Sequence, residues 1–146
     1  MKLILILIIS SFGCTLISHA QTSTWKLYLN KKQVAQGTVT QRSDSTIIVL
    51  KKSRLSRSKL LRIDYMESVV PKGWNRSFAF YDGDKEIAHF KFGSSSGMFG
   101  IPLKQTQLLK AGGKIISLYT YSEPLDEKLA SAIRIRRILI CRLKIE

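Results

Sequence analysis

Short runs in which apolar and polar residues alternate recur along this chain of 146 residues. In residues 25–29, Trp25, Leu27 and Leu29 fall on one face, and Lys26 and Tyr28 fall on the other. A period of two is typical of a β-strand with one buried face. The same criterion predicts strands at 25–29, 33–40, 59–65, 77–92 and 114–121. Gly37 is expected to interrupt the second of them. Residues 46–50 are apolar on both faces, which predicts a strand at a central position of a sheet.

Residues 77–92 carry the clearest pattern, two aromatic-rich runs around Asp82-Gly83-Asp84. Asp-Gly between alternating runs predicts a β-hairpin. The hairpin register turns His89 outward. It also places four phenylalanines on one face: Phe78, Phe80, Phe90 and Phe92.

The segments between the later strands predict loops and little helix. Residues 93–102 are rich in Gly and Ser and end at Pro102, which predicts a flexible loop. The leucines of residues 103–111 suit one short helix, which Gly112-Gly113 would stop. Residues 122–131 predict a turn that contains a helical loop.

Residues 133–146, IRIRRILICRLKIE, distinguish a strand from a helix by their periodicity. At about 100° per residue the apolar side chains would surround a helix on all sides, which argues against an amphipathic membrane helix. In an extended chain, six of seven positions on one face are apolar, and Arg137 is the exception. We predict a long final strand with Leu139, Cys141 and Leu143 in the core and a basic outer face.

Together these patterns predict an all-β fold. About eight short strands with one short helix indicate a single antiparallel β-sandwich or barrel-like domain.

The N-terminal residues predict export. Lys2 is followed by an apolar run from Leu3 to Ile9 that continues more weakly to Ile17, and Ser18-His19-Ala20 provides small residues for signal peptidase. Residues 1–20 are therefore expected to be a cleavable signal peptide. Residues 21–146 would then form one β domain, which is secreted, periplasmic or at the cell surface.

Two alternatives to this cleavage concern the same segment. A retained membrane anchor is disfavoured because polar residues and Gly13 interrupt the run short of the roughly 20 apolar residues that a bilayer requires. A lipid on Cys14 is disfavoured because apolar Leu16 and Ile17 follow the cysteine.

Charge and cysteine content limit the partners and the chemistry. The formal charge is +14, and it falls to +13 when Lys2 leaves with the signal. Such an excess favours anionic partners, either a polymer or an envelope component, but it does not indicate a protein partner. Cys141 would be the sole cysteine of the exported domain, which excludes an internal disulfide.

No motif in the sequence predicts catalysis, a metal site or a cofactor. His89 would be the sole histidine after cleavage, and no G-x-S-x-G elbow accompanies it. Asp82, Asp84 and Glu86 alternate as calcium ligands do, but the remaining ligands of a calcium loop are missing. We therefore expect no catalytic residue, no bound metal and no cofactor.

The strongest candidate contact surface is the basic run of residues 51–62, which contains no acid. Its cations are Lys51, Lys52, Arg54, Arg57, Lys59 and Arg62. They would bind phosphates or sulfates and lose affinity as salt rises, although a solvated loop would have the same composition. Outward Tyr28, Tyr119 and Tyr121 are candidate stacking surfaces for sugars or bases.

The sequence thus predicts a non-enzymatic binding or structural module of the cell envelope, with no membrane span after cleavage. Its contact surface would be residues 51–62 and the outer face of the last strand. One alternative is a small hydrolase whose carboxylates meet only in the fold. Another is an inhibitor that inserts residues 93–102 into a secreted enzyme.

Overall fold

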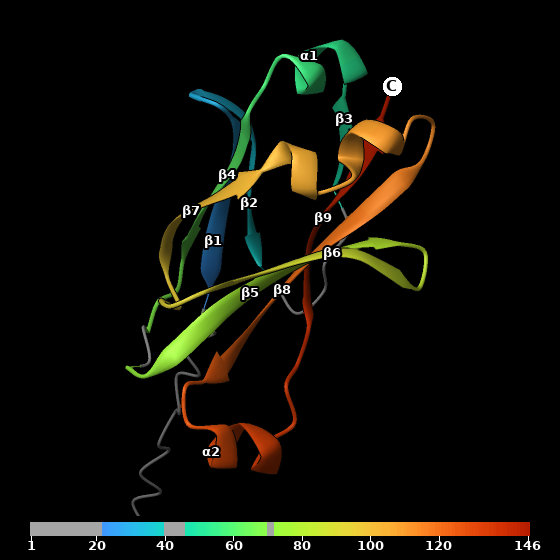
Figure 1. The fold of residues 1–146 in the computed structure, drawn as a ribbon. Helices are drawn as coiled ribbons and strands as arrows, with labels where there is room; N and C mark the ends of the chain where they lie inside the picture. Colours follow the sequence, from blue (N-terminus) through green and yellow to red (C-terminus); the bar gives the residue numbers. More distant parts are fainter. Residues whose placement is uncertain (1–21, 40–45, 70–71) are drawn as a thin grey trace, which may run out of the picture.

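The computed structural model describes residues 22–39, 46–69 and 72–146 (Figure 1). The chain there is mostly strand, which confirms the predicted all-β class. The strands are β1 (Ser23–Leu29), β2 (Lys32–Val39), β3 (Ile47–Leu50), β4 (Leu60–Met66), β5 (Trp74–Asp82), β6 (Lys85–Phe92), β7 (Gly97–Pro102), β8 (Ile115–Pro124) and β9 (Ile138–Ile145). The helical elements are α1 (Lys52–Ser56), α2 (Glu127–Ala132) and two 3-10 turns, η1 (Leu103–Gln105) and η2 (Leu108–Lys110). The predicted signal peptide and Cys14 lie outside the described residues.

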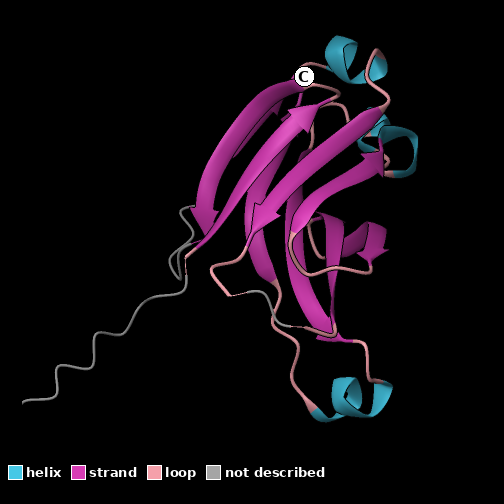
Figure 2. Ribbon diagram, turned by 90° about the vertical axis from the view of Figure 1, so that its left-hand side faces the viewer, coloured by secondary structure: helices cyan, strands magenta, loops and turns pink. Residues whose placement is uncertain are grey.

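The strands form two sheets that make a sandwich. One sheet has the order β2-β1-β4-β7 and the other the order β3-β9-β8-β5-β6. The prediction of a central position for residues 46–50 is wrong, because β3 is an edge strand whose outer face is exposed. All neighbouring strands are antiparallel except β3 and β9, which run parallel. Figure 2 shows α1 and the 3-10 turns at one end of the strands and α2 at the other. The loops of the α1 end and of the α2 end are therefore far apart.

Alternating side chains of both sheets form one core between them. Leu27, Ile63 and Ile101 come from one sheet, and Phe78 and Leu118 from the other, all with no exposed surface. Rings cross from sheet to sheet, since Phe78 and Phe92 lie 5.1 and 5.0 Å from Phe99 between ring centroids. This aromatic contact accounts for the aromatic enrichment of the predicted hairpin.

The β5–β6 hairpin confirms the predicted register. Phe78 pairs with Phe90, and the rings of Phe80 and Phe90 lie 6.1 Å apart. The turn is Gly83-Asp84, and Gly83 has a φ of 60°, which glycine adopts without strain. His89 is exposed, as the register predicts.

Gly37 does not interrupt β2, contrary to the prediction. It pairs with Trp25 across the β1–β2 ladder. The indole ring of Trp25 lies over the glycine so closely that a β-carbon there would be 2.7 Å from Cζ2 of Trp25. The glycine is thus a place where a neighbouring ring covers the backbone, a known way of stabilising glycine in a strand.

Residues 93–102 are not one flexible loop, because β7 occupies their second half and pairs with β4. Phe99 and Ile101 alternate into the core, and Pro102 ends the strand at the sheet edge, where a missing N–H is tolerated. The glycines at 97 and 100 concealed this alternation. Residues 93–96 remain outside the strands in the segment that the inhibitor hypothesis would insert.

The single helix predicted for residues 103–111 is also wrong, because two separate 3-10 turns form instead. Gln107 between them has a left-handed φ of 58°, which ends the helical geometry. The hydroxyl of Thr106 donates to the carbonyl of Leu103 at 2.7 Å and accepts from the amide of Leu108 at 3.3 Å. Such local side-chain bonds compete with a continuous helix. The helical loop predicted at 122–131 is present as α2.

The final strand is shorter than predicted. β9 begins at Ile138, so the part of the strand prediction that covers residues 133–137 is wrong. The ladder with β8 shifts register between Cys141 and Leu139, so Ile140 is an extra, buried residue and Leu139 is half-buried. Cys141 and Leu143 are fully buried, as predicted, whereas the prediction that Leu139 lies in the core is wrong. The bulge at Ile140 thus shifts the alternation, so that the side chains before Cys141 no longer follow the predicted inner and outer faces.

A buried arginine connects the two sheets near the α2 end. Arg76 on β5 is 1% exposed, and its guanidinium lies 4.3 Å from the ring centroid of Tyr65 on β4. Its Nη2 donates to Glu67, and its Nε donates to the carbonyl of Ser95 at 2.8 Å. Its Nη1 donates to Thr120 on β8 at 3.3 Å. The charge is therefore paired and hydrogen-bonded, as a buried charge must be.

Candidate anion-binding surface

The predicted basic run folds as a short helical connection between the sheets. Leu55 of α1 is fully buried and fixes the helix to the core, which leaves Lys51, Lys52 and Arg57 exposed. The Nε of Arg57 donates to the carbonyl of Ser53 at 3.1 Å, so the base of that side chain lies along α1. The run is thus an ordered part of the fold with its cations on the surface.

Two members of the run lie outside this helix. Lys59 is exposed and immediately precedes β4. Arg62 lies within β4 opposite Tyr28 of β1 and is half-buried. Arg62 is on the outer face of the four-stranded sheet, so it lies apart from the other cations of the run. Those five cations, Lys51, Lys52, Arg54, Arg57 and Lys59, lie together.

The β1–β2 turn adds cations to the same end. The side-chain oxygen of Asn30 accepts the amides of Lys59 and Leu60 at 3.0 and 3.3 Å, and the amide of Asn30 donates to the carbonyl of Leu60 at 2.9 Å. These bonds place the turn directly beside Lys59. Its exposed Lys31 and Lys32 therefore join the surface.

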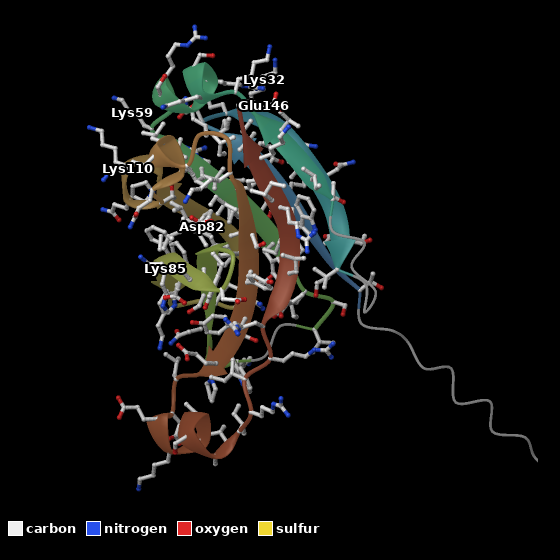
Figure 3. All side chains as sticks on the ribbon, turned by 90° about the vertical axis from the view of Figure 1, so that its right-hand side faces the viewer. Lys32, Lys59, Asp82, Lys85, Lys110 and Glu146 are labelled. Atoms are coloured by element: carbon white, nitrogen blue, oxygen red, sulfur yellow. The ribbon has the colours of Figure 1, made fainter. Side chains whose placement is uncertain are left out.

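The 3-10 turns contribute the remaining cations. The amide of Leu103 donates to the carbonyl of Lys59 at 3.0 Å, which sets η1 beside the start of β4. Lys52 reaches the other turn, since its amine lies 4.0 Å from the point where a β-carbon on Gly112 would be. Lys104 and Lys110 are exposed on η1 and η2. Figure 3 shows Lys32, Lys59 and Lys110 toward the same end of the molecule.

We call this set the cationic end: Lys31, Lys32, Lys51, Lys52, Arg54, Arg57, Lys59, Lys104 and Lys110. Glu146 is the carboxylate beside it, because the amide of Lys52 donates to the backbone carbonyl of Glu146. The amine of Lys144 donates to the Glu146 carboxylate at 2.7 Å. This bond, together with the charges of Lys144 and Lys51, lowers the pKa of Glu146. In the part of the chain that the structure describes, no cation of the set forms an ion pair.

Five of the nine cations of the cationic end could be predicted from the sequence as one surface. The basic run is contiguous, and its charge is visible at once. The other cations join it because β4 pairs between β1 and β7, which brings residues 30, 59 and 103 together. The Asn30-Lys31-Lys32 turn is apparent in the sequence, but nothing there indicates which strand it meets.

The predicted tyrosines separate onto two sheets. Tyr28 lies on the four-stranded sheet, whereas Tyr119 and Tyr121 lie on the outer face of the five-stranded sheet with Tyr81 and His89. The hydroxyl of Tyr121 is 2.9 Å from Nε2 of His89. Burial is the main cause that raises the pKa of Tyr121. The other ring nitrogen of His89, Nδ1, lies 3.8 Å from the carboxylate of Glu86.

The ring of Tyr81 is already covered by a cation of the same chain. Arg137 places its guanidinium 5.1 Å from the centroid of Tyr81 and 5.9 Å from that of Tyr119. The Tyr81 hydroxyl donates to Glu86 at 2.6 Å, and this bond is the main cause that raises the pKa of Tyr81. Cation–π contact with Arg137 holds the segment before β9 against the sheet. These rings are thus engaged within the fold and do not form a free stacking platform.

Four carboxylates of the described residues are held by partners within the fold. Glu67 is paired with Arg76, Asp82 with Lys114, and Glu123 with Lys91. Asp126 accepts the amides of Lys128 and Leu129 as the N-cap of α2. A surface hollow near the start of β9 is lined by Arg134, Ile135, Arg136 and Arg137, without an acid. Each of these four carboxylates therefore has a structural role.

Residues 22–39, 46–69 and 72–146 contain no group of three or more His, Cys, Asp or Glu side chains placed to hold a metal ion. The same ranges contain no helix long and apolar enough to cross a bilayer.

Comparison with known proteins gives no family for the chain. No protein-family model matches it, and no curated protein matches it.

Proposed function

We propose that this protein is an exported, non-enzymatic binding module that holds an anionic component of the cell envelope at its cationic end. The observation that carries the proposal is the gathering of nine Lys and Arg side chains from three connections, β1–β2, β3–β4 and β7–β8, at one end of the sandwich. The neighbouring carboxylate of Glu146 is already bonded to Lys144. The positive charge of this end is therefore available to an external anion.

The arrangement suits an extended anion better than a small one. The cations lie on separate surface connections, and they do not surround a closed cavity. Phosphate or sulfate groups spaced along a partner could each contact one cation, releasing counterions as they bind. A binding module of this kind needs no converging polar groups, in contrast to the hydrolase alternative.

The first expected result concerns retention on heparin, a sulfated polymer used as the probe. Changing Lys51, Lys52, Arg57 and Lys59 together to Ser should lower the salt concentration at which the protein elutes. The slope of log affinity against log salt should become shallower by about one unit for each lost contact. These four side chains are exposed, so the fold should be unaffected.

The matched control removes the same charge elsewhere. Lys72, Lys85, Lys128 and Arg134 are also exposed and lie outside the cationic end. Their joint replacement by Ser should shift elution much less than the first variant does. Equal shifts for the two variants would show that net charge alone retains the protein, and the proposed site would then be wrong.

Export is part of the same proposal. Its support is the apolar run after Lys2 and the Ser18-His19-Ala20 sequence. Mass spectrometry of the N-terminal peptide of the processed protein should find a chain that begins at Gln21 and carries no lipid. A diacylated fragment that begins at Cys14 would contradict this part of the proposal and would tether the module to a membrane.

A further inference from the structure

The outer face of the β3–β9–β8 region alternates exposed apolar side chains with cations. Ile47 and Val49 on β3 are 50% and 51% exposed, and Ile115 on β8 is 44% exposed. The strand between them is β9, whose Arg142 and Lys144 point to the same face. The register pairs Ile47 with Arg142 and sets Lys144 between Val49 and Ile115. We call these five residues the mixed patch.

The apolar side chains of this patch are not needed by the core. β3 already contributes Ile48 and Leu50 to the interior, at 8% and 2% exposure, so its other face could be polar at no cost to packing. β3 is also the edge strand of its sheet, and edge strands usually carry charges on exposed positions. Three branched aliphatic side chains at such a place require another explanation.

The mixed patch is continuous with the cationic end. β3 leads directly into Lys51 and α1, and the amide of Glu146, which follows β9, donates to the carbonyl of Leu50 at 3.0 Å. Arg142 is exposed and forms no ion pair with the described residues. A partner at the cationic end would therefore meet the patch as well.

We infer that the mixed patch docks on the surface of a bilayer that contains anionic lipids. This inference rests on the proposed function and specifies its partner. Arg142 and the neighbouring cationic end would contact lipid phosphates, and Ile47, Val49 and Ile115 would enter the boundary between headgroups and acyl chains. Attraction between opposite charges and burial of apolar side chains would then both stabilise binding at one face of the protein.

Other partners would use only part of the patch. A polysaccharide or a nucleic acid would engage the cations but leave the aliphatic side chains in water. Surfaces that bind sugars or bases present aromatic rings, and the patch has none. A bilayer interface is the anionic partner that uses both kinds of side chain.

The test is co-sedimentation of the processed protein with vesicles. Vesicles of phosphatidylcholine alone are compared with vesicles that contain about 30 mol% phosphatidylglycerol, a typical anionic lipid. The variant is Ile47→Thr with Val49→Thr, which keeps β-branched side chains and every charge. The control is Met98→Thr, because Met98 is 60% exposed on the opposite sheet.

We expect the wild type and Met98→Thr to bind the anionic vesicles and not the neutral ones. The double variant should bind the anionic vesicles about tenfold more weakly, since it loses apolar area at the interface. Its elution from heparin should be unchanged. Weaker vesicle binding with unchanged heparin elution would show that the apolar side chains of the mixed patch contribute to membrane binding, in addition to the attraction between charges.

Three results would overturn the inference. If the wild type is retained on heparin but does not bind anionic vesicles, the bilayer is not the partner, while the proposed function remains. Equal vesicle binding by the double variant would show that the cations act alone. A dimer of the wild type that the double variant abolishes, without vesicle binding, would assign the patch to a second copy of the chain. Failure of the proposed function itself would appear instead in the heparin comparison of the two charge variants.

Discussion

Glu67→Ala should lower the free energy of unfolding by about 3 to 5 kcal/mol, because it leaves the guanidinium of Arg76 buried without its carboxylate. Arg76 is 1% exposed and the Glu67 side chain 17%, so water can compensate little of the loss. Urea denaturation followed by tryptophan fluorescence or circular dichroism measures this quantity. The slope of the transition should stay unchanged if the protein unfolds in one step.

A double variant separates the effect of the two charges from the effect of packing around them. Arg76→Met with Glu67→Met removes both charges and retains apolar volume, so it should recover much of the stability that Glu67→Ala loses. Lys114→Ala is the exposed comparison, since it breaks an ion pair with Asp82 that solvent screens, and we expect a cost of at most about 1 kcal/mol. If Glu67→Ala costs no more than Lys114→Ala, the buried pair does not hold the sheets together.

The Arg76 network also shows where sequence reasoning is limited. Trp74, Arg76, Phe78 and Phe80 alternate on one face of β5, but the predicted strand began at residue 77 and therefore left out Arg76. The partners of Arg76 were not predicted either, because Glu67, Ser95 and Thr120 come from three other parts of the chain. Only the strand order shows which groups satisfy the buried guanidinium.

Elsewhere in the fold, too, the sequence predicted the elements with a regular local pattern and missed the others. Regular alternation predicted most strands and the β5–β6 register correctly, because a period of two directly reflects one buried face. β7 was missed since glycines break its alternation, and the helix at 103–111 was wrong since Thr106 and Gln107 act through local hydrogen bonds and a left-handed backbone. Of the candidate site, the contiguous cations could be predicted, but the turns that join them could not.

Leu143→Ala should cost about 2 to 5 kcal/mol, the range for a large-to-small change at a fully buried site. β9 lies between β3 and β8, and Leu143 pairs with Ile48 on one side and Ile116 on the other. Leu139→Ala is the matched control, since the same chemical change on the same strand falls before the bulge at a half-buried position. It should cost clearly less in the same urea titration.

The reactivity of the Cys141 thiol measures how often β9 opens, in the wild type and in the variants. Burial raises the pKa of its thiol to about 12, so the reactive thiolate is scarce in the folded protein. Labelling with a thiol reagent near pH 8 should therefore be slow until the domain opens. In Leu143→Ala a loss of about 2 kcal/mol should raise the labelling rate about thirtyfold if labelling requires global unfolding.

Rapid labelling of the wild type, together with equal stability of the Leu143→Ala and Leu139→Ala variants, would mean that β9 is not part of the core. Deleting residues 138–146 would then be tolerated, whereas the observed strand order requires that this deletion prevent folding by separating β3 from β8.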